Sequence, residues 1–288
     1  MEKVNEEKVE QNSGNIFAFH LLMDEMCDMP NEEFIQDIMD KYLGGTDHLG
    51  YHGDSVIYVP REYNIHLDDG KVISPQLMFT KCLNIEEPLM TDLEKTQLWN
   101  CKEGLDILEE CKYEVLATDV LGGILDYKKR ANMLVNYVLA LMEIYPNCKA
   151  VLFDNSKKML TRDQIVNCNL VYESRFIYYA VNIRYFTIQG TNDMIVDSIG
   201  MNTLGLPDLQ YHFHDLDPNL IINHALFVLS YIYDNNNPIK SNDFIDGIKN
   251  GEISMDVSWK VDYEESLLVP YREVIDVNTN EFASGNRE

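Results

Sequence analysis

The sequence is poor in basic side chains. It has 23 Lys and Arg residues against 48 Asp and Glu residues, which gives a formal net charge of −25. Nucleic-acid binding needs cationic side chains that displace counterions from phosphates, and the densest basic cluster is only residues 128–130. An anionic surface is also repelled by the inner leaflet of a membrane. The charge therefore argues against nucleic-acid and membrane partners and favours a basic protein partner.

Cysteine pairs and long apolar runs are also lacking. None of the six cysteines forms a C-x-x-C pair, and the first fourteen residues are charged and polar, unlike a secretory signal. The longest apolar stretch, 220–233, is shorter than the roughly 20 residues that span a bilayer. We therefore expect a cytoplasmic protein with reduced cysteines.

What the sequence does contain is typical of a globular protein. Its hydrophobic share is 45% and its charged share 25%. Residues 1–14 are predicted to form a disordered acidic tail, and residues 279–288 a flexible C-terminal tail. Between them, residues 15–278 are predicted to form a single α+β domain. The pattern also allows two subdomains, at about 15–170 and 171–278.

Apolar periodicity and helix-capping residues predict several helices. They are expected over residues 31–43, 92–101, 126–145 and 218–233, with a short one after Thr161. Thr91 with Glu94, and Thr161 with Gln164, have the spacing of capping boxes. Pro218 follows Asp217, as a proline at the first helical position follows its N-cap residue.

Strands are predicted between these helices. They are expected over residues 16–23, 55–59, 63–67, 77–83, 113–119, 149–153, 175–188, 194–199, 209–214, 254–263 and 273–277. The run 175–188 is bulky on both alternating faces, as expected of a central strand. The order of elements predicts an α+β fold with mixed, mainly antiparallel sheet and helices packed largely on one face. Two similar halves would also fit this order.

The best candidate for a metal site is the pair His212 and His214. Residues two apart on a strand share a face, so both imidazoles could reach one ion. His224, two turns into the following helix, and the nearby Asp208 would complete a zinc-like ligand set. The simpler alternative is one solvent-facing histidine and others paired with neighbouring acids. The spacing matches no motif with a defined mechanism, and no other cofactor is expected.

Three charged residues are candidate binding residues. Arg184 lies inside an apolar run, and a buried guanidinium needs a carboxylate partner; Asp119 or Asp197 would serve. Asp208 ends the segment 200–208, a glycine-containing turn whose backbone N–H groups could face an anion, although a structural turn is the simpler interpretation. Charges in a cleft can mark an active site, although structural ion pairs have the same sequence pattern.

No catalytic residue can be named from the sequence. A G-x-S-x-G elbow is lacking. Cys111 and Cys168 lie near predicted helix ends, but cysteine is commonly a small buried hydrophobe. Several tyrosines could line a cleft between two halves, or simply fill the core: Tyr178, Tyr179, Tyr185 and Tyr211.

Four segments of the second half resemble a known protein family. They are Arg175-Phe-Ile-Tyr-Tyr-Ala-Val-Asn-Ile-Arg184, Gln189-Gly-Thr-Asn-Asp-Met-Ile-Val-Asp197, Leu204-Gly-Leu-Pro-Asp-Leu-Gln-Tyr-His-Phe-His214, and Trp259 through Val277. The family is the uncharacterised bacterial domain-of-unknown-function family 4261. The resemblance implies a bacterial cytoplasmic protein without an assigned reaction, and it carries over no catalytic residues.

These features leave three functional hypotheses. The first is a non-enzymatic protein-interaction module, for example an inhibitor or immunity-like protein that docks on a basic partner by charge complementarity. The alternative is a metal-dependent hydrolase at His212 and His214, where the metal generates a hydroxide nucleophile. The third is a small-molecule or peptide-binding module. The sequence favours the first hypothesis and leaves the oligomeric state open.

Overall fold

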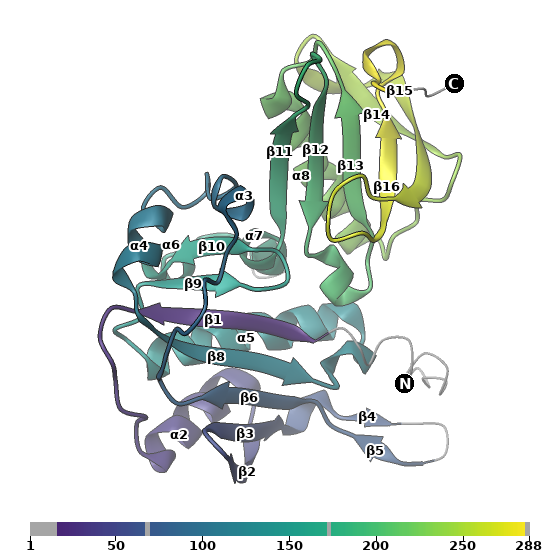
Figure 1. Cartoon of the computed structure of the whole chain (residues 1–288). Coiled ribbons are helices and arrows are strands. Elements are labelled where there is room, and N and C mark those ends of the chain that lie inside the picture. Colours follow the sequence, from purple (N-terminus) through teal and green to yellow (C-terminus); the bar gives the residue numbers. More distant parts are fainter. Residues whose placement is uncertain (1–15, 67–69, 172–173, 286–288) are drawn as a thin grey trace. The chain divides into compact units, whose positions relative to one another are not determined.

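A computed structural model describes residues 16–66, 70–171 and 174–285 of the chain. The predicted α+β class is confirmed (Figure 1). The chain divides into two compact units, the first comprising residues 1–180 with 203–205 and the second 181–202 with 206–288. The main division therefore follows Ala180, compared with the position near 170 considered from the sequence. The predicted tail 1–14 lies outside the described residues.

The first unit is built on an eight-stranded sheet with the order β10-β9-β1-β8-β6-β3-β2, and β7 also pairs with β8. Its strands are β1 (Phe17–Met23), β2 (Thr46–His52), β3 (Ser55–Pro60), β6 (Gln76–Thr80), β7 (Leu83–Asn84), β8 (Tyr113–Val120), β9 (Ala150–Phe153) and β10 (Lys158–Thr161). β4 (Ile65–His66) and β5 (Val72–Ile73) form a separate pair. The pairings of this sheet are antiparallel, as predicted.

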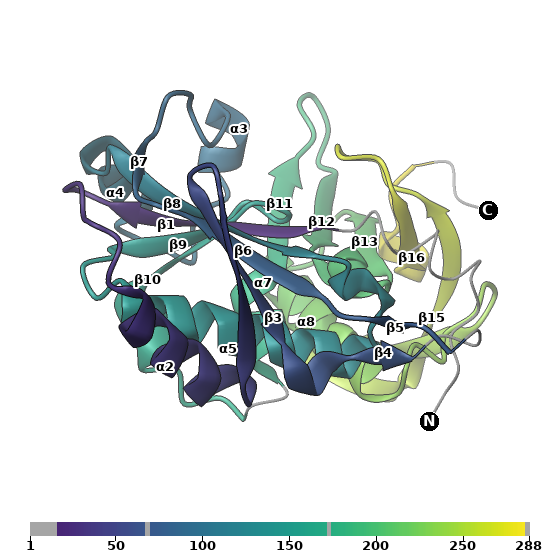
Figure 2. The ribbon, with the colours of Figure 1, turned by 90° about the horizontal axis from the view of Figure 1, so that it is seen from below.

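Helices lie on both faces of this sheet (Figure 2). α2 (Glu32–Leu43) and α5 (Tyr127–Ile144) cover one face, where Phe19 of β1 meets Tyr137 of α5 edge-on at 5.5 Å. On the other face, Leu22 of β1 packs in a cluster with Ile107 of α4 (Gly104–Glu110). α3 (Asp92–Lys95), α6 (Arg162–Val166) and α7 (Arg175–Ala180) are short. Helices were predicted to pack largely on one face. In this unit α2 and α5 share a face, whereas α4 lies on the opposite one.

The helix ends follow the capping residues. Both predicted capping boxes are present, at Thr91 and Thr161. The single helix predicted over 92–101 is wrong, because α3 ends at Lys95 and α4 begins at Gly104. The Thr96 hydroxyl donates to the carbonyl of Leu93, and such local bonds compete with continuation of a helix.

The second unit is a six-stranded sheet with the order β11-β12-β13-β16-β15-β14. Its strands are β11 (Asn182–Thr187), β12 (Met194–Ile199), β13 (Asp208–Phe213), β14 (Phe244–Lys249), β15 (Glu252–Glu265) and β16 (Glu273–Asn278). β13 and β16 are parallel, whereas the other pairings of this sheet are antiparallel. α8 (Pro218–Asp234), capped by Asp217, packs on the face that presents Tyr211.

Short 3-10 turns complete both units. They are η1 (Arg61–Tyr63), η2 (Gly122–Ile124), η4 (Met201–Leu204) and η5 (Asn280–Phe282).

The strand predicted over 175–188 is a helix followed by an edge strand. Residues 175–180 form α7, whose Phe176 packs 6.1 Å from Phe17, ring centre to ring centre, in the first unit. Residues 182–187 form β11, which lies at an edge of the second sheet. The apolar run 175–188 is continuous because its first part, α7, belongs to the core of the first unit and its second part, β11, belongs to the second unit. A strand buried on both faces gives the same sequence pattern.

Residues 279–285 of the predicted tail make contacts with β13. The His214 amide donates to the Phe282 carbonyl at 2.8 Å, and the Ser284 amide donates to the His212 carbonyl at 2.9 Å. Thr279 and Ser284 are both buried. The backbone of this segment therefore pairs with the end of β13. Residues 286–288 lie outside the described part.

Candidate functional site

A row of polar side chains crosses the second sheet on one face. Strand register aligns Arg184 with Asp197, Asp197 with Gln210, Gln210 with Asp276, and Asp276 with Asp262. Side chains on a strand alternate between faces, and Tyr211, next to Gln210, points to α8. These five residues, here called the polar row, therefore lie on the face away from α8.

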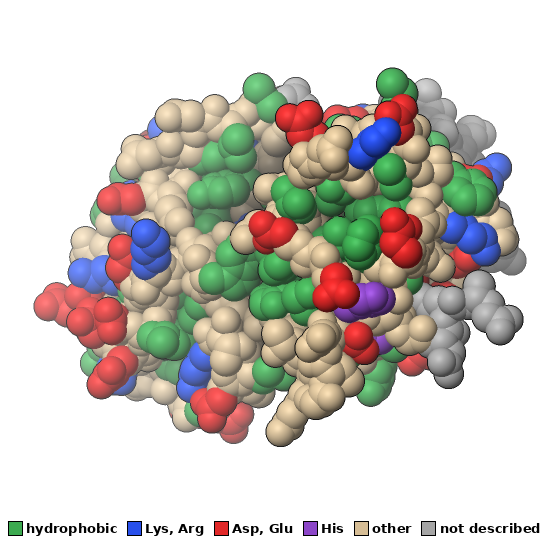
Figure 3. Space-filling model, turned by 90° about the horizontal axis from the view of Figure 1, so that it is seen from above, with side chains coloured by type: hydrophobic (Ala, Val, Ile, Leu, Met, Phe, Trp, Pro, Cys, Tyr) green, Lys and Arg blue, Asp and Glu red, His purple; other side chains and the backbone are tan. Residues whose placement is uncertain are grey.

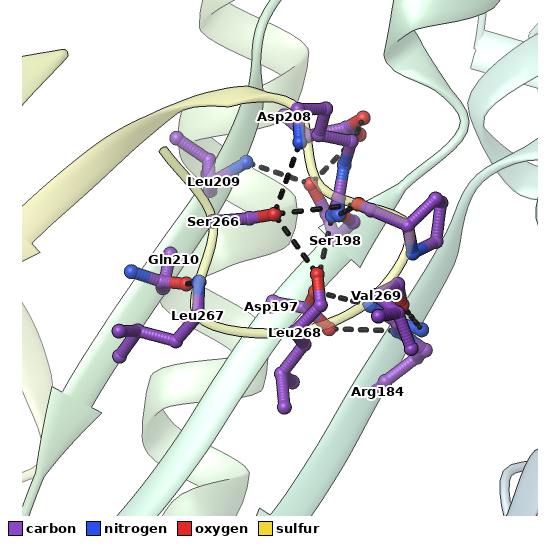
Figure 4. A network of polar contacts seen from close by, with 12 residues as sticks. Arg184, Asp197, Ser198, Asp208, Leu209, Gln210, Ser266, Leu267, Leu268 and Val269 are labelled. Carbon is purple, nitrogen blue, oxygen red and sulfur yellow. Dashed lines mark hydrogen bonds and ion pairs between the residues drawn. The ribbon is translucent and has the colours of Figure 1, made fainter. Parts of the chain in front are cut away.

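The loop 266–272, which joins β15 to β16, folds over this row (Figure 4). Gln210 Oε1 accepts a hydrogen bond from the Leu267 amide at 2.7 Å. Arg184 Nη1 donates to the Val269 carbonyl at 2.9 Å. The Ser266 hydroxyl donates to the Leu268 carbonyl at 2.9 Å and accepts from the backbone N–H of Arg272 at 3.2 Å. Polar contacts from the sheet and within the loop therefore hold its backbone in place.

Arg184 and Asp197 form a bidentate pair. Arg184 Nε lies 2.9 Å from Asp197 Oδ1, and Nη2 lies 2.5 Å from Oδ2. Asp197 is fully buried. Of the two partners considered from the sequence, Asp197 is the one that the structure places beside Arg184. Asp119 instead pairs with Arg130 in the first unit at 2.9 Å. Bidentate arginine–carboxylate pairs are strong and directional.

Asp208 belongs to the same network through Arg272. Arg272 Nε donates to Asp208 Oδ2 at 3.2 Å, and Arg272 Nη2 donates to Asp197 Oδ2 at 3.0 Å and to the Ser198 carbonyl. Burial raises the pKa of the Asp208 carboxyl above its ordinary value, although Arg272 and donors from Met201 and Ser198 act in the opposite direction. Arg184, Asp197 and Asp208 are thus brought together.

The turn 200–207 directs its amides inward. Asp208 Oδ1 accepts from the Met201 amide and from the Ser198 hydroxyl, both at 3.1 Å. Asp208 Oδ2 accepts from the Gly200 amide at 3.4 Å. The anion that these amides face is therefore a carboxylate of the chain itself. All four oxygens of Asp197 and Asp208 accept hydrogen bonds, so the pair is engaged in holding the loop.

The outer side of the loop is apolar and exposed. Leu267 is 50% exposed, Val269 58% and Tyr271 67%. Acidic residues at the adjoining strand ends are exposed as well: Glu264, Glu265 and Glu273. With its backbone bonded to the sheet and Leu267, Val269 and Tyr271 exposed, the loop presents an apolar surface with an acidic rim.

The structure does not gather the three candidate metal-binding histidines. His212 Nε2 lies 3.8 Å from Asp193, and His214 Nδ1 lies 3.3 Å from the Ser284 hydroxyl. His224 is buried on the α8 side, with Nδ1 2.9 Å from the Tyr211 hydroxyl and Nε2 2.7 Å from the Asp246 carbonyl. Burial lowers its pKa. Among the described residues, no group of three or more His, Cys, Asp or Glu side chains is arranged to hold a metal ion.

The first unit holds a second charged cluster, on β1. His20 Nδ1 lies 2.6 Å from Glu114, Nε2 lies 3.7 Å from Asp154, and Asp154 also pairs with Lys157. Burial by itself lowers the pKa of His20, but Asp154 and Glu114 outweigh it and raise that pKa to about 9. Its cation is therefore stabilised inside the sheet.

The other candidates from the sequence are placed as ordinary core or surface residues. Tyr179 and Tyr211 are buried in different units. Tyr178 lies in the first unit and is partly exposed, as is Tyr185 in the second. Cys111 is buried, and burial raises its pKa to about 11, which disfavours the reactive thiolate. All six cysteines are free.

Sequence reasoning missed Arg272, Gln210 and the loop itself. The available signal was Ser266-Leu-Leu-Val-Pro-Tyr-Arg272, an apolar run at a proline-containing turn between two predicted strands. Apolar side chains in a turn have no sheet face to bury them. A lone histidine in the apolar strand 16–23 was the corresponding signal for His20.

Comparison with known families gives one match. Residues 197–278 match the family described as domain of unknown function DUF4261, which confirms the resemblance over this segment. The matched residues include Asp197, Asp208 and Arg272 and the whole 266–272 loop. A search of the curated proteins and one of the solved structures found no match. Within the described residues, none of the helices has the length and apolar character needed to cross a bilayer.

Proposed function

We propose that this chain, which carries domain DUF4261 over residues 197–278, is a non-enzymatic protein-interaction module whose 266–272 loop binds a basic protein partner. The observation that carries the proposal is the two-sided character of the loop. Its inner side is held by buried arginine–aspartate pairs, and its outer side exposes Leu267, Val269 and Tyr271.

A loop held in this way is suited to binding because its ordering cost is met before the partner arrives. Association otherwise loses free energy to the ordering of loops and side chains. Tyrosine is among the residue types enriched at interface hot spots, and apolar neighbours exclude water around such a residue. Tyr271, with Leu267 and Val269 beside it, is therefore the expected centre of the contact.

The charge of the surrounding surface indicates the class of partner. Glu264, Glu265 and Glu273 border the loop, and the whole chain carries a net charge of −25. Acidic side chains are not confined to the border of this loop. On the face shown in Figure 3 they lie among exposed hydrophobic side chains. Complementary charge speeds encounter and fixes orientation, so a basic surface with an apolar centre is the matching partner.

A specific form of the proposal is an inhibitor or immunity-like protein in the cytoplasm of a bacterium, bound to a basic toxin or nuclease. Its support is the acidic balance, the six free cysteines and the family resemblance. A metal-dependent hydrolase at His212 and His214 has less support. The third expected ligand, His224, is hydrogen-bonded to the Tyr211 hydroxyl and to the Asp246 carbonyl instead.

The experiment is a quantitative pull-down from the native host at low and high salt. The bait is the full chain, either native or with Leu267, Val269 and Tyr271 all replaced by serine. The control bait carries serine at Phe244, Ile253 and Met255, three exposed apolar residues on β14 and β15 of the same unit. We expect a basic protein that binds the native and control baits, is lost from the loop variant, and is weakened by salt.

The outcomes separate the parts of the proposal. Loss of the same partner from both variant baits would mean that apolar exposure in general, and not this loop, drives capture. If no protein depends on the loop at either salt concentration, the interaction proposal fails. If the captured partner depends on the loop but is acidic and insensitive to salt, the loop is the binding surface and the proposal of a basic partner is wrong.

A further inference from the structure

The first unit contains an apolar pocket that the proposed interaction does not use. Its volume is about 340 Å³. It lies on the sheet face away from α2 and α5, beside α4. The lining residues include Leu22, Met90, Lys95, Leu105, Glu109 and Cys111.

The inner wall of the pocket offers carbon and sulfur side chains. Leu22, Met90 and Cys111 are each almost fully buried and belong to one hydrophobic cluster. Among the described residues that line the pocket there is no aromatic ring, so stacking of a nucleobase or a flat aromatic cofactor has no partner from them. Burying a polar group without a hydrogen-bond partner is costly. The inner wall therefore suits an aliphatic group.

Charged side chains occur only among the more exposed lining residues. The Lys95 side chain is more than a third exposed, and its ion pair is with the fully exposed Asp92 at 3.1 Å. Glu109 is also exposed. Exposed ion pairs contribute little, so these groups are able to face a ligand's polar end. The pocket thus has an apolar interior and a charged mouth.

We propose that this pocket binds the aliphatic chain of a small amphipathic molecule, whose polar head stays in water beside Lys95 and Glu109. The volume lies at the lower end of the range for small-molecule sites. Chain burial supplies the affinity, and the two charges of opposite sign at the mouth act on the head group.

The test is calorimetric titration of the full chain with hexanol, octanol and decanol, each kept below its aggregation concentration. Each added methylene buried should tighten binding about fourfold until the pocket is full. Decanoate and decylamine then report the preferred head-group charge. Absence of binding by all five compounds, or affinity that does not rise with chain length, would overturn the proposal.

Two matched variants locate the site. Leu105 and Leu93 are both 58% exposed and lie on the neighbouring helices α4 and α3, but only Leu105 lines the pocket. Leu105→Trp should fill the mouth and weaken decanol binding at least tenfold, whereas Leu93→Trp should leave it within twofold. Equal effects of the two variants would place binding elsewhere.

A third measurement does not depend on any variant. Because Cys111 is buried and its pKa is raised, labelling by a thiol reagent is followed over an incubation long enough to modify Cys111 measurably in the free protein. Decanol should then slow that labelling, read by peptide mass spectrometry, at least fivefold. Cys168, which is partly exposed and does not line the pocket, is the internal control. Equal labelling of Cys111 with and without decanol would contradict the assignment even if Leu105→Trp fails to fold.

Discussion

The two units cover their sheets in different ways. In the first, helices lie on both faces: α2 and α5 on one, and α4 on the other (Figure 2). In the second, α8 covers one face, and the 266–272 loop lies over the other. A helix buries a sheet with apolar side chains, but a loop brings unpaired backbone groups that must be satisfied. This is why the polar row lies on the face of the second sheet that the loop covers.

This contrast also bears on function. A helix that covers a sheet turns its apolar stripe inward. The loop of the second unit is held through its backbone and through Ser266 and Arg272, so its remaining large side chains are free to face outward. Because ion pairs and hydrogen bonds hold this loop on the sheet, its exposed apolar side chains are not needed for that contact and can bind a partner.

The largest expected effect is at the centre of the loop's support. Asp197→Ala leaves Arg184 and Arg272 without a shared carboxylate, and breaking such a buried pair costs about 3–5 kcal/mol. Urea unfolding should show this loss. Asp256→Ala, which breaks an exposed pair with Lys249, should cost less than about 1 kcal/mol.

The same change in the first unit sharpens the comparison. Asp119→Ala removes the buried partner of Arg130 and should cost about as much as Asp197→Ala. If only one of the two variants is strongly destabilised, ion pairs do not play equivalent roles in the two units.

The next effect is the pH dependence of the first unit. His20 has a folded pKa of about 9 against an ordinary value of 6.5. The stabilisation it gives is fully present below pH 6.5 and is lost as the pH rises through 9. The free energy of unfolding should fall over this range by up to about 3 kcal/mol. His20→Gln should remove most of the fall, and an unchanged slope in that variant would show that other groups cause it.

A smaller effect is expected on the α8 side of the second sheet. Tyr211→Phe removes the hydroxyl that meets His224 and leaves a buried ring nitrogen unsatisfied. We expect a loss of about 1–3 kcal/mol in thermal or urea unfolding. Tyr231→Phe, at an exposed position of α8, should be nearly neutral. Equal values for both variants would mean that the buried contact contributes nothing.

The smallest effect is expected on the outer side of the loop. Replacing Leu267, Val269 and Tyr271 together by serine should change stability by no more than about 0.5 kcal/mol per site, because these side chains are exposed. A large loss of stability, measured by urea unfolding, would show that the side chains are structural. It would also remove the basis for using them as binding residues.

The fold could be predicted where the signal is local. Asn31, Thr91, Thr161 and Asp217 each cap the helix that the sequence placed after them. Three of the unpredicted strands, β2, β10 and β14, lie at edges of the two large sheets. β2 and β14 are mostly exposed or half-buried, so neither has the strongly apolar pattern of a core strand.

The candidate site was predicted in part, for a related reason. An arginine inside an apolar run signals a buried carboxylate, and this led to Asp197. The choice between Asp197 and Asp119 depends on the register of β11 with β12, which composition does not encode. Arg272 lies just after a turn, where no periodicity marks it. The sequence placed His224 beside His212 and His214. In the structure His224 contacts Tyr211, and because Tyr211 is next to His212 on β13, the two side chains point to opposite faces of the sheet.

The parallel pairing of β13 with β16 has a consequence for how the second unit is synthesised. These neighbours are separated in sequence by α8, β14 and β15, so their contact closes a long stretch of chain. Contacts between residues so distant in sequence form slowly. On the ribosome, β13 has no β16 beside it until translation has passed Asn278, and chaperones that shield unpaired strands would act in that interval.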